Sequence, residues 1–336
     1  MQSDPTEIEK KIFKATNVDF EALAIDLFNY QYQENSFYRS FCNHLKIRQS
    51  EVQKLTQIPF LPIRFFKTNR IVSGVFKEAE VFESSGTSGS INSKHFVKDL
   101  SLYETSFLKG ISHFYGDLTN ICIIGLLPSY LEKGQSSLVY MVNNLIQKSK
   151  IVSSGFFLNE TEALKKLLLY NESIGQQTLL FGVTYALLDF AEENPLQLQH
   201  TTVVETGGMK GRRTEMTRSQ VHDVLKKQWQ LKTVHSEYGM TELLSQAYSF
   251  GEGLFRTSPW MKVLIRAEDD PFEVKCAPEV AHEPITGVIN IIDLANIYSC
   301  AFIATDDMGI LYQNESFEVV GRIDNSDIRG CSLMLL

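Results

Sequence analysis

Apolar strand patterns alternate with amphipathic helix patterns between residues 120 and 238, and this alternation limits the fold more than any other feature of the chain. Strand patterns occupy 120–129, the beginning of 176–190, 201–208 and 231–239; helix patterns occupy 136–147, the end of 176–190 and 217–229. The last helix opens with a capping box of Thr217 and Gln220. Such alternation predicts an α/β fold with a doubly wound, mostly parallel sheet that has helices on both faces.

The segments on either side of this region have other patterns. Helical spacing of apolar residues over 19–57 predicts an N-terminal helical segment, residues 1–60, that packs on the core. The remainder, 61–336, is predicted to be one large domain in which 250–323 form a smaller β-rich part and 324–336 a C-terminal tail. Ligands of doubly wound sheets bind beyond the carboxyl ends of the strands, so the loops after the strands are the informative ones.

Composition excludes several classes of protein. The net charge of −8 and the pI near 5.5 argue against a surface that tracks nucleic-acid phosphates. No apolar run is long enough to cross a bilayer, and the N-terminus MQSDPTEIEKK lacks the core of a signal peptide. Five scattered cysteines without CxxC spacing argue against a disulfide framework or a zinc site. We expect a soluble cytoplasmic protein that neither binds nucleic acid nor spans a membrane.

The stretch FESSGTSGS, residues 82–90, predicts an anion-binding loop, followed by a helix that begins near Asp99 or Ser101. Glycines let backbone amides turn toward one point and hydroxyl groups add donors, which suits phosphate. The loop residues are Ser84, Ser85, Gly86, Thr87, Ser88 and Gly89. A Walker A loop is excluded because its Gly-Lys-Ser/Thr end is absent, and a hydrolase elbow because Ser90 stands where glycine is needed. By itself the stretch also fits a polar turn.

SEYGMTELLSQ, residues 236–246, places an aromatic ring, a glycine, a hydroxyl group and a carboxylate within five positions. Tyr238 could stack on a purine and Thr241 could hydrogen-bond a phosphate oxygen. Glu242 could hold Mg²⁺, which usually binds one or two carboxylates beside phosphates. The alternative is a strand-to-helix turn in which Glu242 is a carboxylate of the first helical turn.

Two later stretches add polar groups near the end of the chain. ATDDMG, residues 304–309, offers Asp306 and Asp307 as acceptors for ribose hydroxyl groups, although adjacent aspartates before glycine are also turn chemistry. GRIDNSDIRG, residues 321–330, contributes Arg322. His235 could line a pocket or be a structural histidine of its strand.

The order SSGTSG, GG, YGMTE, TDD and GRxD resembles the acyl-adenylate-forming superfamily over about residues 60–331. The resemblance implies the fold of the large N-terminal domain of those enzymes, with ATP and Mg²⁺ as cofactors. It implies phosphate binding by Ser84 to Gly89 with Lys94 as the basic residue of the loop, and adenine flanked by Gly207 and Gly208. It further implies Tyr238 on the adenine, Gly239 in the turn, Thr241 at the α-phosphate, Glu242 on magnesium, and Asp307 with Arg322 at the ribose.

The chain departs from that superfamily after GRxD, where ordinary members continue for about a hundred residues as a lid domain that carries a lysine. Without a lid the layout resembles the acyl-protein synthetase family, which serves the fatty-acid reductase complex of bacterial bioluminescence. The stretches that match are FLPIRFFK, LPSYLEKGQSSLVYMV, ETGGMK, YGMTELLSQ and RGCSL. The resemblance implies that Cys331 accepts the acyl group from the adenylate and passes it to a reductase subunit.

Physical arguments support Cys331 as an acceptor. The backbone from Asp324 to Cys331 can extend on the order of 25 Å, and Arg329 favours the thiolate. The alternative is a cysteine of a frayed tail. We therefore expect an ATP-dependent ligase that activates a carboxylic acid, fatty by family resemblance although an aryl or short acid also fits. The alternatives are a ligase with coenzyme A or an acyl carrier as acceptor, and a non-catalytic acyl- or nucleotide-binding subunit. The sequence leaves the oligomeric state open.

Overall fold

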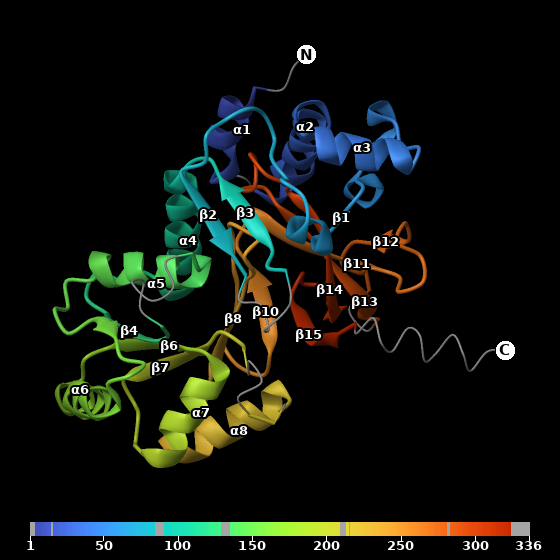
Figure 1. Cartoon of the computed structure of the whole chain (residues 1–336). Coiled ribbons are helices and arrows are strands. Elements are labelled where there is room, and N and C mark those ends of the chain that lie inside the picture. The colour runs from blue at the N-terminus through green and yellow to red at the C-terminus, as the bar shows by residue number, and fades with distance from the viewer. Residues whose placement is uncertain are drawn as a thin grey trace.

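The computed structural model describes residues 4–14, 16–84, 91–128, 135–208, 213–214, 216–280 and 283–323 (Figure 1). Within these ranges one 13-stranded sheet has the order β12-β11-β13-β14-β15-β10-β9-β8-β7-β6-β4-β5, with β1 paired to β14, and a separate ribbon is formed by β2 and β3. The chain thus has the α/β fold that the sequence predicts, and it is organised around a mixed sheet.

The middle of the chain forms the parallel half of the sheet. Its strands are β4 Cys122–Leu126, β5 Gly155–Phe156, β6 Thr178–Gly182, β7 Thr201–Glu205 and β8 His235–Tyr238, all paired in parallel. The connecting helices are α5 Ser137–Lys148, α6 Thr161–Ile174, α7 Thr184–Glu193 and α8 Arg218–Trp229. In Figure 1, α4 (Leu100–Tyr115) and α5 cover one side of these strands while α7 and α8 cover the other. The alternation predicted from the sequence is confirmed.

The helix starts predicted from capping residues are confirmed. Asp99 accepts a hydrogen bond from the backbone N–H of Ser101 and is the N-cap of α4. Thr217 and Gln220 form the reciprocal capping box of α8.

The antiparallel half continues the same sheet. Its strands are β9 Ala247–Ser249, β10 Leu254–Thr257, β11 Met261–Arg266, β12 Val274–Lys275, β13 Ile285–Asp293, β14 Phe302–Leu311 and β15 Phe317–Arg322. Residues 250–323 are therefore rich in strands, and these strands belong to the same sheet as β4 to β8. The change from parallel to antiparallel pairing falls between β8 and β9, where Tyr238 is opposite Ala247.

The N-terminal helices pack against the antiparallel half. They are α1 Pro5–Ile12, α2 Asn17–Glu34 and α3 Ser36–His44, followed by the 3₁₀ turns η1 Gln49–Glu51, η2 Leu55–Gln57 and η3 Ile63–Lys67. The amide of Gln31 donates to the carbonyls of Asn296 and Ile297 at 2.8 and 2.9 Å. The short strand β1, Leu61–Pro62, then pairs in parallel with β14.

The predicted phosphate loop lies between the two strands of the ribbon, β2 Glu80–Glu83 and β3 Lys94–Val97. Residues 85–90 themselves lie outside the described residues, as does the tail 324–336. Phe82 is fully buried against Tyr103 of α4, which fixes the ribbon over the parallel half of the sheet. In the described part of the chain, no helix combines the length and the apolar character needed to cross a bilayer.

Candidate nucleotide and acyl site

The YGMTE motif forms a loop at the place where the sheet changes direction. Tyr238 ends β8, and residues 239–246 run to β9 without entering a helix. The alternative of a strand-to-helix turn is therefore wrong, because pairing of β9 with β8 and β10 keeps the following residues extended. Glu242 is 4% exposed in this loop and is not a carboxylate of a helical first turn.

Two buried side chains hold the backbone of this loop. His95 of β3 donates from Nδ1 to the carbonyl of Thr241 at 2.8 Å, and Asn296 donates to the carbonyl of Glu242 at 2.6 Å. Burial lowers the pKa of His95 to about 4, so the ring is neutral near pH 7 and its Nδ1 bears the proton that the carbonyl accepts. The ribbon strand β3 is thereby fastened to the motif that follows β8.

Asp293, at the end of β13, holds the second half of the same loop. Its carboxylate accepts from the N–H groups of Leu244 and Ser245 at 2.8 and 3.1 Å and from the Ser245 hydroxyl at 2.6 Å. Burial nevertheless raises the pKa of Asp293 to about 6, because these donors offset only part of the desolvation. His95, Asn296 and Asp293 were not predicted as site residues. The only sequence signal for the last two is that they are two of the three polar residues in the otherwise apolar run GVINIIDLANI.

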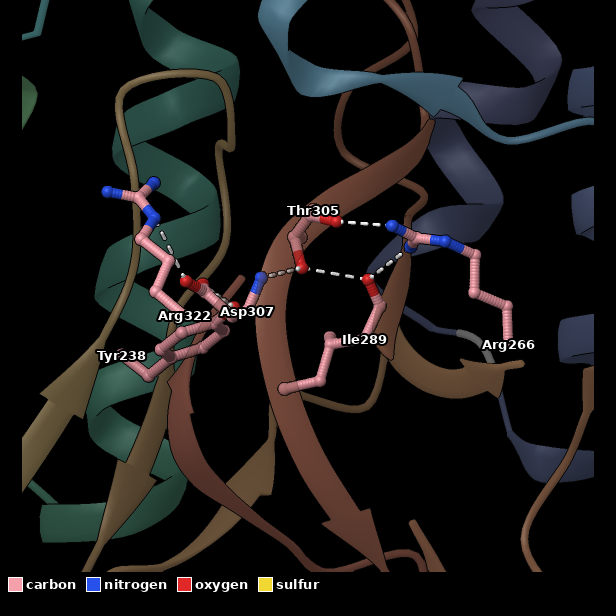
Figure 2. Close-up of polar contacts among 6 residues, drawn as sticks. All are labelled: Tyr238, Arg266, Ile289, Thr305, Asp307 and Arg322. Atoms are coloured by element: carbon pink, nitrogen blue, oxygen red, sulfur yellow. Dashed lines mark hydrogen bonds and ion pairs between the residues drawn. The ribbon is translucent and has the colours of Figure 1, made fainter. Parts of the chain in front are cut away.

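The structure brings together three of the predicted residues, Tyr238, Asp307 and Arg322 (Figure 2). The phenol of Tyr238 donates to Oδ2 of Asp307 at 2.8 Å, and Nε of Arg322 lies 3.4 Å from Oδ1. Burial raises the pKa of Asp307, while Tyr238 and Arg322 act in the opposite direction. The Tyr238 ring packs edge-on against Phe317, with ring centroids 5.6 Å apart. The result is an oriented carboxylate with a largely exposed guanidinium beside it.

A hydrogen-bond network behind Asp307 was not visible in the sequence (Figure 2). Arg266 of β11 donates to the carbonyls of Thr305 and Ile289 at 2.6 and 3.1 Å and to the Asn290 side chain at 2.6 Å. The Thr305 hydroxyl donates to the Ile289 carbonyl at 2.8 Å and accepts from the N–H of Asp307 at 3.1 Å. These bonds bridge an irregularity in the β13–β14 pairing between Val288 and Asn290, so Arg266 and Thr305 are positioning residues for Asp307.

The Gly207–Gly208 pair follows β7 and is held from below by Glu205. Both glycines have positive φ, +77° and +97°, which a residue with a side chain adopts only with strain. The Glu205 carboxylate accepts from the N–H of Gly207 at 2.8 Å and from the Thr184 hydroxyl at the start of α7. The turn therefore presents backbone, not side chains, to the space above it.

Most of the predicted residues that the structure describes line one cleft of about 1050 Å³. They are Ser84, Gly207, Gly208, Tyr238, Gly239, Thr241, Glu242, Asp307 and Arg322. Lys94 is not among the lining residues; it faces Glu83 across the ribbon, 3.1 Å away. The predicted residues Ser85, Gly86, Thr87, Ser88, Gly89 and Cys331 lie outside the described residues.

Cationic side chains missed by sequence reasoning also line the cleft. They are Arg64, Lys67 and Arg218, which come from η3 and α8. Together with Arg322 they place four cationic side chains on a lining that also has five carboxyl groups, so donors for phosphate oxygens and acceptors for hydroxyl groups lie in one cleft. Arg64 and Lys67 are the basic pair of the stretch LPIRFFK, which is part of the family resemblance.

Glu242 is the one predicted metal ligand. Its surroundings fit a magnesium ion that is bound partly by the phosphates of a nucleotide better than an ion bound by protein side chains alone. Burial raises the pKa of Glu242, against the effects of Ser93, Arg322 and Lys67. The described residues contain no group of three or more metal-binding side chains. A single carboxylate completed by phosphate oxygens and water is a common arrangement for magnesium, so Glu242 fits that role.

A second cavity of about 640 Å³ opens from the first beside α5. It shares Gly207, Gly208 and Thr241 with the cleft, and its wall includes the apolar residues Leu127, Leu138, Val139, Met141 and Val183. His235 lines neither space. It contacts the Tyr115 hydroxyl at 3.2 Å, and burial lowers its pKa to about 4, as expected for a structural histidine.

Comparisons with known proteins agree with this geometry. The fold resembles that of 2-hydroxyisobutyryl-CoA ligase in its postadenylation state, with a TM-score of 0.60, 10% identity, and coverage of 94% of this chain and 70% of the ligase. It also resembles the long-chain-fatty-acid-CoA ligase FadD1 from Archaeoglobus fulgidus, with a TM-score of 0.50, 13% identity, and coverage of 75% of this chain and 52% of that enzyme. No curated protein sequence matches the chain. The family model for "Acyl-protein synthetase, LuxE" matches residues 1–336, and the chain therefore belongs to the LuxE acyl-protein synthetases, built on the large domain of adenylate-forming ligases.

Proposed function

We propose that this protein activates a carboxylic acid with ATP and transfers the acyl group to the thiol of Cys331. The observation that carries the proposal is that the cleft and the cavity beside α5 adjoin each other and share Thr241 and Gly207 as lining residues. One space contains four cationic side chains and the oriented carboxylate of Asp307, and the other has apolar residues on part of its wall. A nucleotide in the first and an acid in the second would bring a carboxylate to the α-phosphate.

The cleft supplies recognition groups for each part of ATP. Asp307 accepts from the ribose hydroxyl groups and Arg322 assists it, since both line the cleft and are paired to each other. The adenine lies along the backbone of Gly207 and Gly208, with Tyr238 on its other side. Lys67, Arg64 and the loop Ser84 to Gly89 bind the phosphates.

Magnesium, when bound, neutralises phosphate charge, and Glu242 with the phosphate oxygens would hold it. Thr241 donates its hydroxyl to an α-phosphate oxygen, and its backbone is fixed for that task by His95. Donors that are already oriented need no reorganisation when charge develops in the transition state.

The reaction then has two steps. A carboxylate oxygen forms a bond to the α-phosphorus while the bond from that phosphorus to the β-phosphate oxygen breaks, which gives acyl-adenylate and pyrophosphate. The Cys331 thiolate attacks the acyl carbon, the carbonyl–phosphate bond breaks and AMP leaves with the electron pair. The product is a thioester on the protein.

The reach of the tail is compatible with this second step. Ile323 is the last described residue and lines the cleft, and Cys331 follows eight residues later, a span of at most about 28 Å. A reducing compartment such as the cytoplasm would keep the thiol free. Family membership supports a fatty acid as the substrate and an acyl reductase as the protein that receives the group.

Intact mass spectrometry tests the proposal. The protein and its Cys331→Ser variant are incubated with ATP, magnesium and a panel of carboxylic acids. We expect an acyl increment on the wild type and none on the variant, with pyrophosphate released by both. Equal pyrophosphate release without any increment would refute Cys331 as acceptor and indicate coenzyme A or an acyl carrier. No pyrophosphate with any acid would refute adenylation and leave the non-catalytic binding subunit.

A further inference from the structure

Two polar side chains, Glu237 and Gln246, line the cavity beside α5. Glu237 is half-buried on β8, and Gln246 is 6% exposed in the loop before β9. Among the described residues, neither side chain makes a hydrogen bond or an ion pair. Polar groups on the wall of a binding cavity are available to a ligand, because a ligand atom can replace the water that would otherwise pair with them. Two such groups on one wall fit a ligand that pairs with both.

Gly239, the glycine of YGMTE, lets these two groups meet. A Cβ atom on residue 239 would collide with Oε1 of Glu237 and lie 3.4 Å from Cγ of Gln246. The carboxyl group and the Gln246 side chain therefore converge over the glycine. Glu237 and Gly239 also line the nucleotide cleft, so this spot lies where the two spaces join.

The charge of the cavity wall indicates the chemistry of such a ligand. The described wall includes two carboxyl groups, Glu83 and Glu237, and no lysine, arginine or histidine. Glu83 has its counter-charge in Lys94, whereas Glu237 is affected by a second carboxylate, Glu205. Burial, with a smaller contribution from Glu205, raises the pKa of Glu237 to about 8. An ammonium group would supply the positive charge, and its N–H groups would donate to both Glu237 and the Gln246 carbonyl oxygen.

We propose that Glu237 and Gln246 bind an amino group of the substrate, so that the acid activated is an amino-substituted carboxylic acid. This inference rests on the proposed adenylation and names its substrate class. Gly239 and Thr241 are two residues apart, so their Cα atoms are separated by at most about 7 Å. The amino group is therefore a few bonds from the carboxylate, and the hydrocarbon part lies against Leu138, Val139 and Met141.

The test compares matched acids in a pyrophosphate-release assay with ATP and magnesium. One set is butanoate, 4-hydroxybutanoate and 4-aminobutanoate; the other is octanoate, 3-hydroxyoctanoate and 3-aminooctanoate. We expect kcat/KM for the amino-substituted acid of either set to exceed that for the unsubstituted acid at least about a hundredfold. Sites that pair a polar group of the substrate discriminate strongly against an analogue that lacks this group. Glu237→Leu should reverse the order. Glu83→Gln, which alters the carboxyl group already paired with Lys94, should retain it.

Titration calorimetry of the same acids separates this inference from the proposed function. In one outcome the wild type binds an amino-substituted acid, Glu237→Leu does not, and no pyrophosphate is released. This result would support the amino-group site and refute adenylation. Pyrophosphate release with an unsubstituted or hydroxy acid equal to or better than the amino acid would keep adenylation and overturn the amino-group site. The Glu237→Gln variant, which preserves shape, controls for folding: it should melt cooperatively and lose the preference.

Discussion

Replacing Thr305 with valine tests whether the network behind Asp307 positions that carboxylate for ATP. Valine keeps the shape of threonine but lacks the hydroxyl, which accepts from the Asp307 N–H at 3.1 Å and donates to the Ile289 carbonyl at 2.8 Å. The Ile289 carbonyl keeps its bond from Arg266 at 3.1 Å, so the main loss is the acceptor for the Asp307 N–H. Thr305 is 1% exposed, and an unpaired donor beside it costs about 1–3 kcal/mol.

We expect this variant to lose about 1–3 kcal/mol of unfolding free energy in urea titrations. If about 1.4 kcal/mol of the nucleotide's binding energy depends on the orientation of Asp307, the KM for ATP rises about tenfold. The KM for the acid should stay unchanged, since Thr305 does not line the cavity beside α5 that we propose for the acid. Steady-state pyrophosphate release, with each substrate varied at saturating levels of the other, measures both constants.

Thr201→Val is the matched control. Thr201 is also a buried threonine whose hydroxyl is bonded, to Glu172 at 2.7 Å, but it begins β7, at the end opposite the glycine pair. It should lose similar stability and leave the KM for ATP unchanged. The positioning argument is wrong if both variants raise the KM for ATP equally. It is also wrong if Thr305→Val lowers stability but leaves the KM for ATP unchanged.

Three other predictions follow from the site. Gly207→Ala places a Cβ on a residue with φ +77°, which strains the backbone. The free energy of unfolding in urea titrations should therefore fall by about 1–2 kcal/mol, and the KM for ATP should rise. Unchanged values would show that the turn tolerates side chains. Asp293→Asn removes one acceptor oxygen from a buried carboxylate that receives four donors, so we expect a loss of about 2–4 kcal/mol and a lower kcat, by calorimetry and pyrophosphate release. In the folded protein Glu237 has a pKa of about 8, above its ordinary value of 4.5, so the folded state holds that proton more tightly and stability falls as pH rises between these values. Glu237→Gln should therefore flatten the decline of the melting temperature over this range, and parallel curves would contradict the assignment.

Much of the fold and part of the site could be predicted because their signals are local. Strand and helix periodicity, the cap at Asp99 and the box at Thr217 depend on neighbours within a few residues. The motif residues could be placed because loops after parallel strands converge at one edge of the sheet. The cleft accordingly contains Gly207, Tyr238 and Thr241.

The positioning residues could not be predicted because they act across long separations in sequence. His95 bonds the carbonyl of residue 241, and Arg266 reaches Thr305 only because β13 lies between β11 and β14. The strand β9 has three residues, too few for a periodic signal, and its neighbour sequence ELLSQ also fits a helical turn. Pairing of Tyr248 with Arg256 of β10 overrides that local tendency.

The pairing of β1 with β14 sets the order in which a ribosome-bound chain can complete its structure. Leu61 can pair only after Ile303 has been synthesised. The Gln31 amide likewise cannot form its hydrogen bonds until the carbonyls 265 and 266 residues later in the sequence exist. At about 5–20 residues per second, roughly 10 to 50 s separate the synthesis of α2 from that of its buried partners. During this interval the apolar face of Phe20, Leu27 and Phe28 has no sheet to cover it. The nascent protein is thus exposed to aggregation at its first helices until β14, the strand that contains Asp307, has been synthesised.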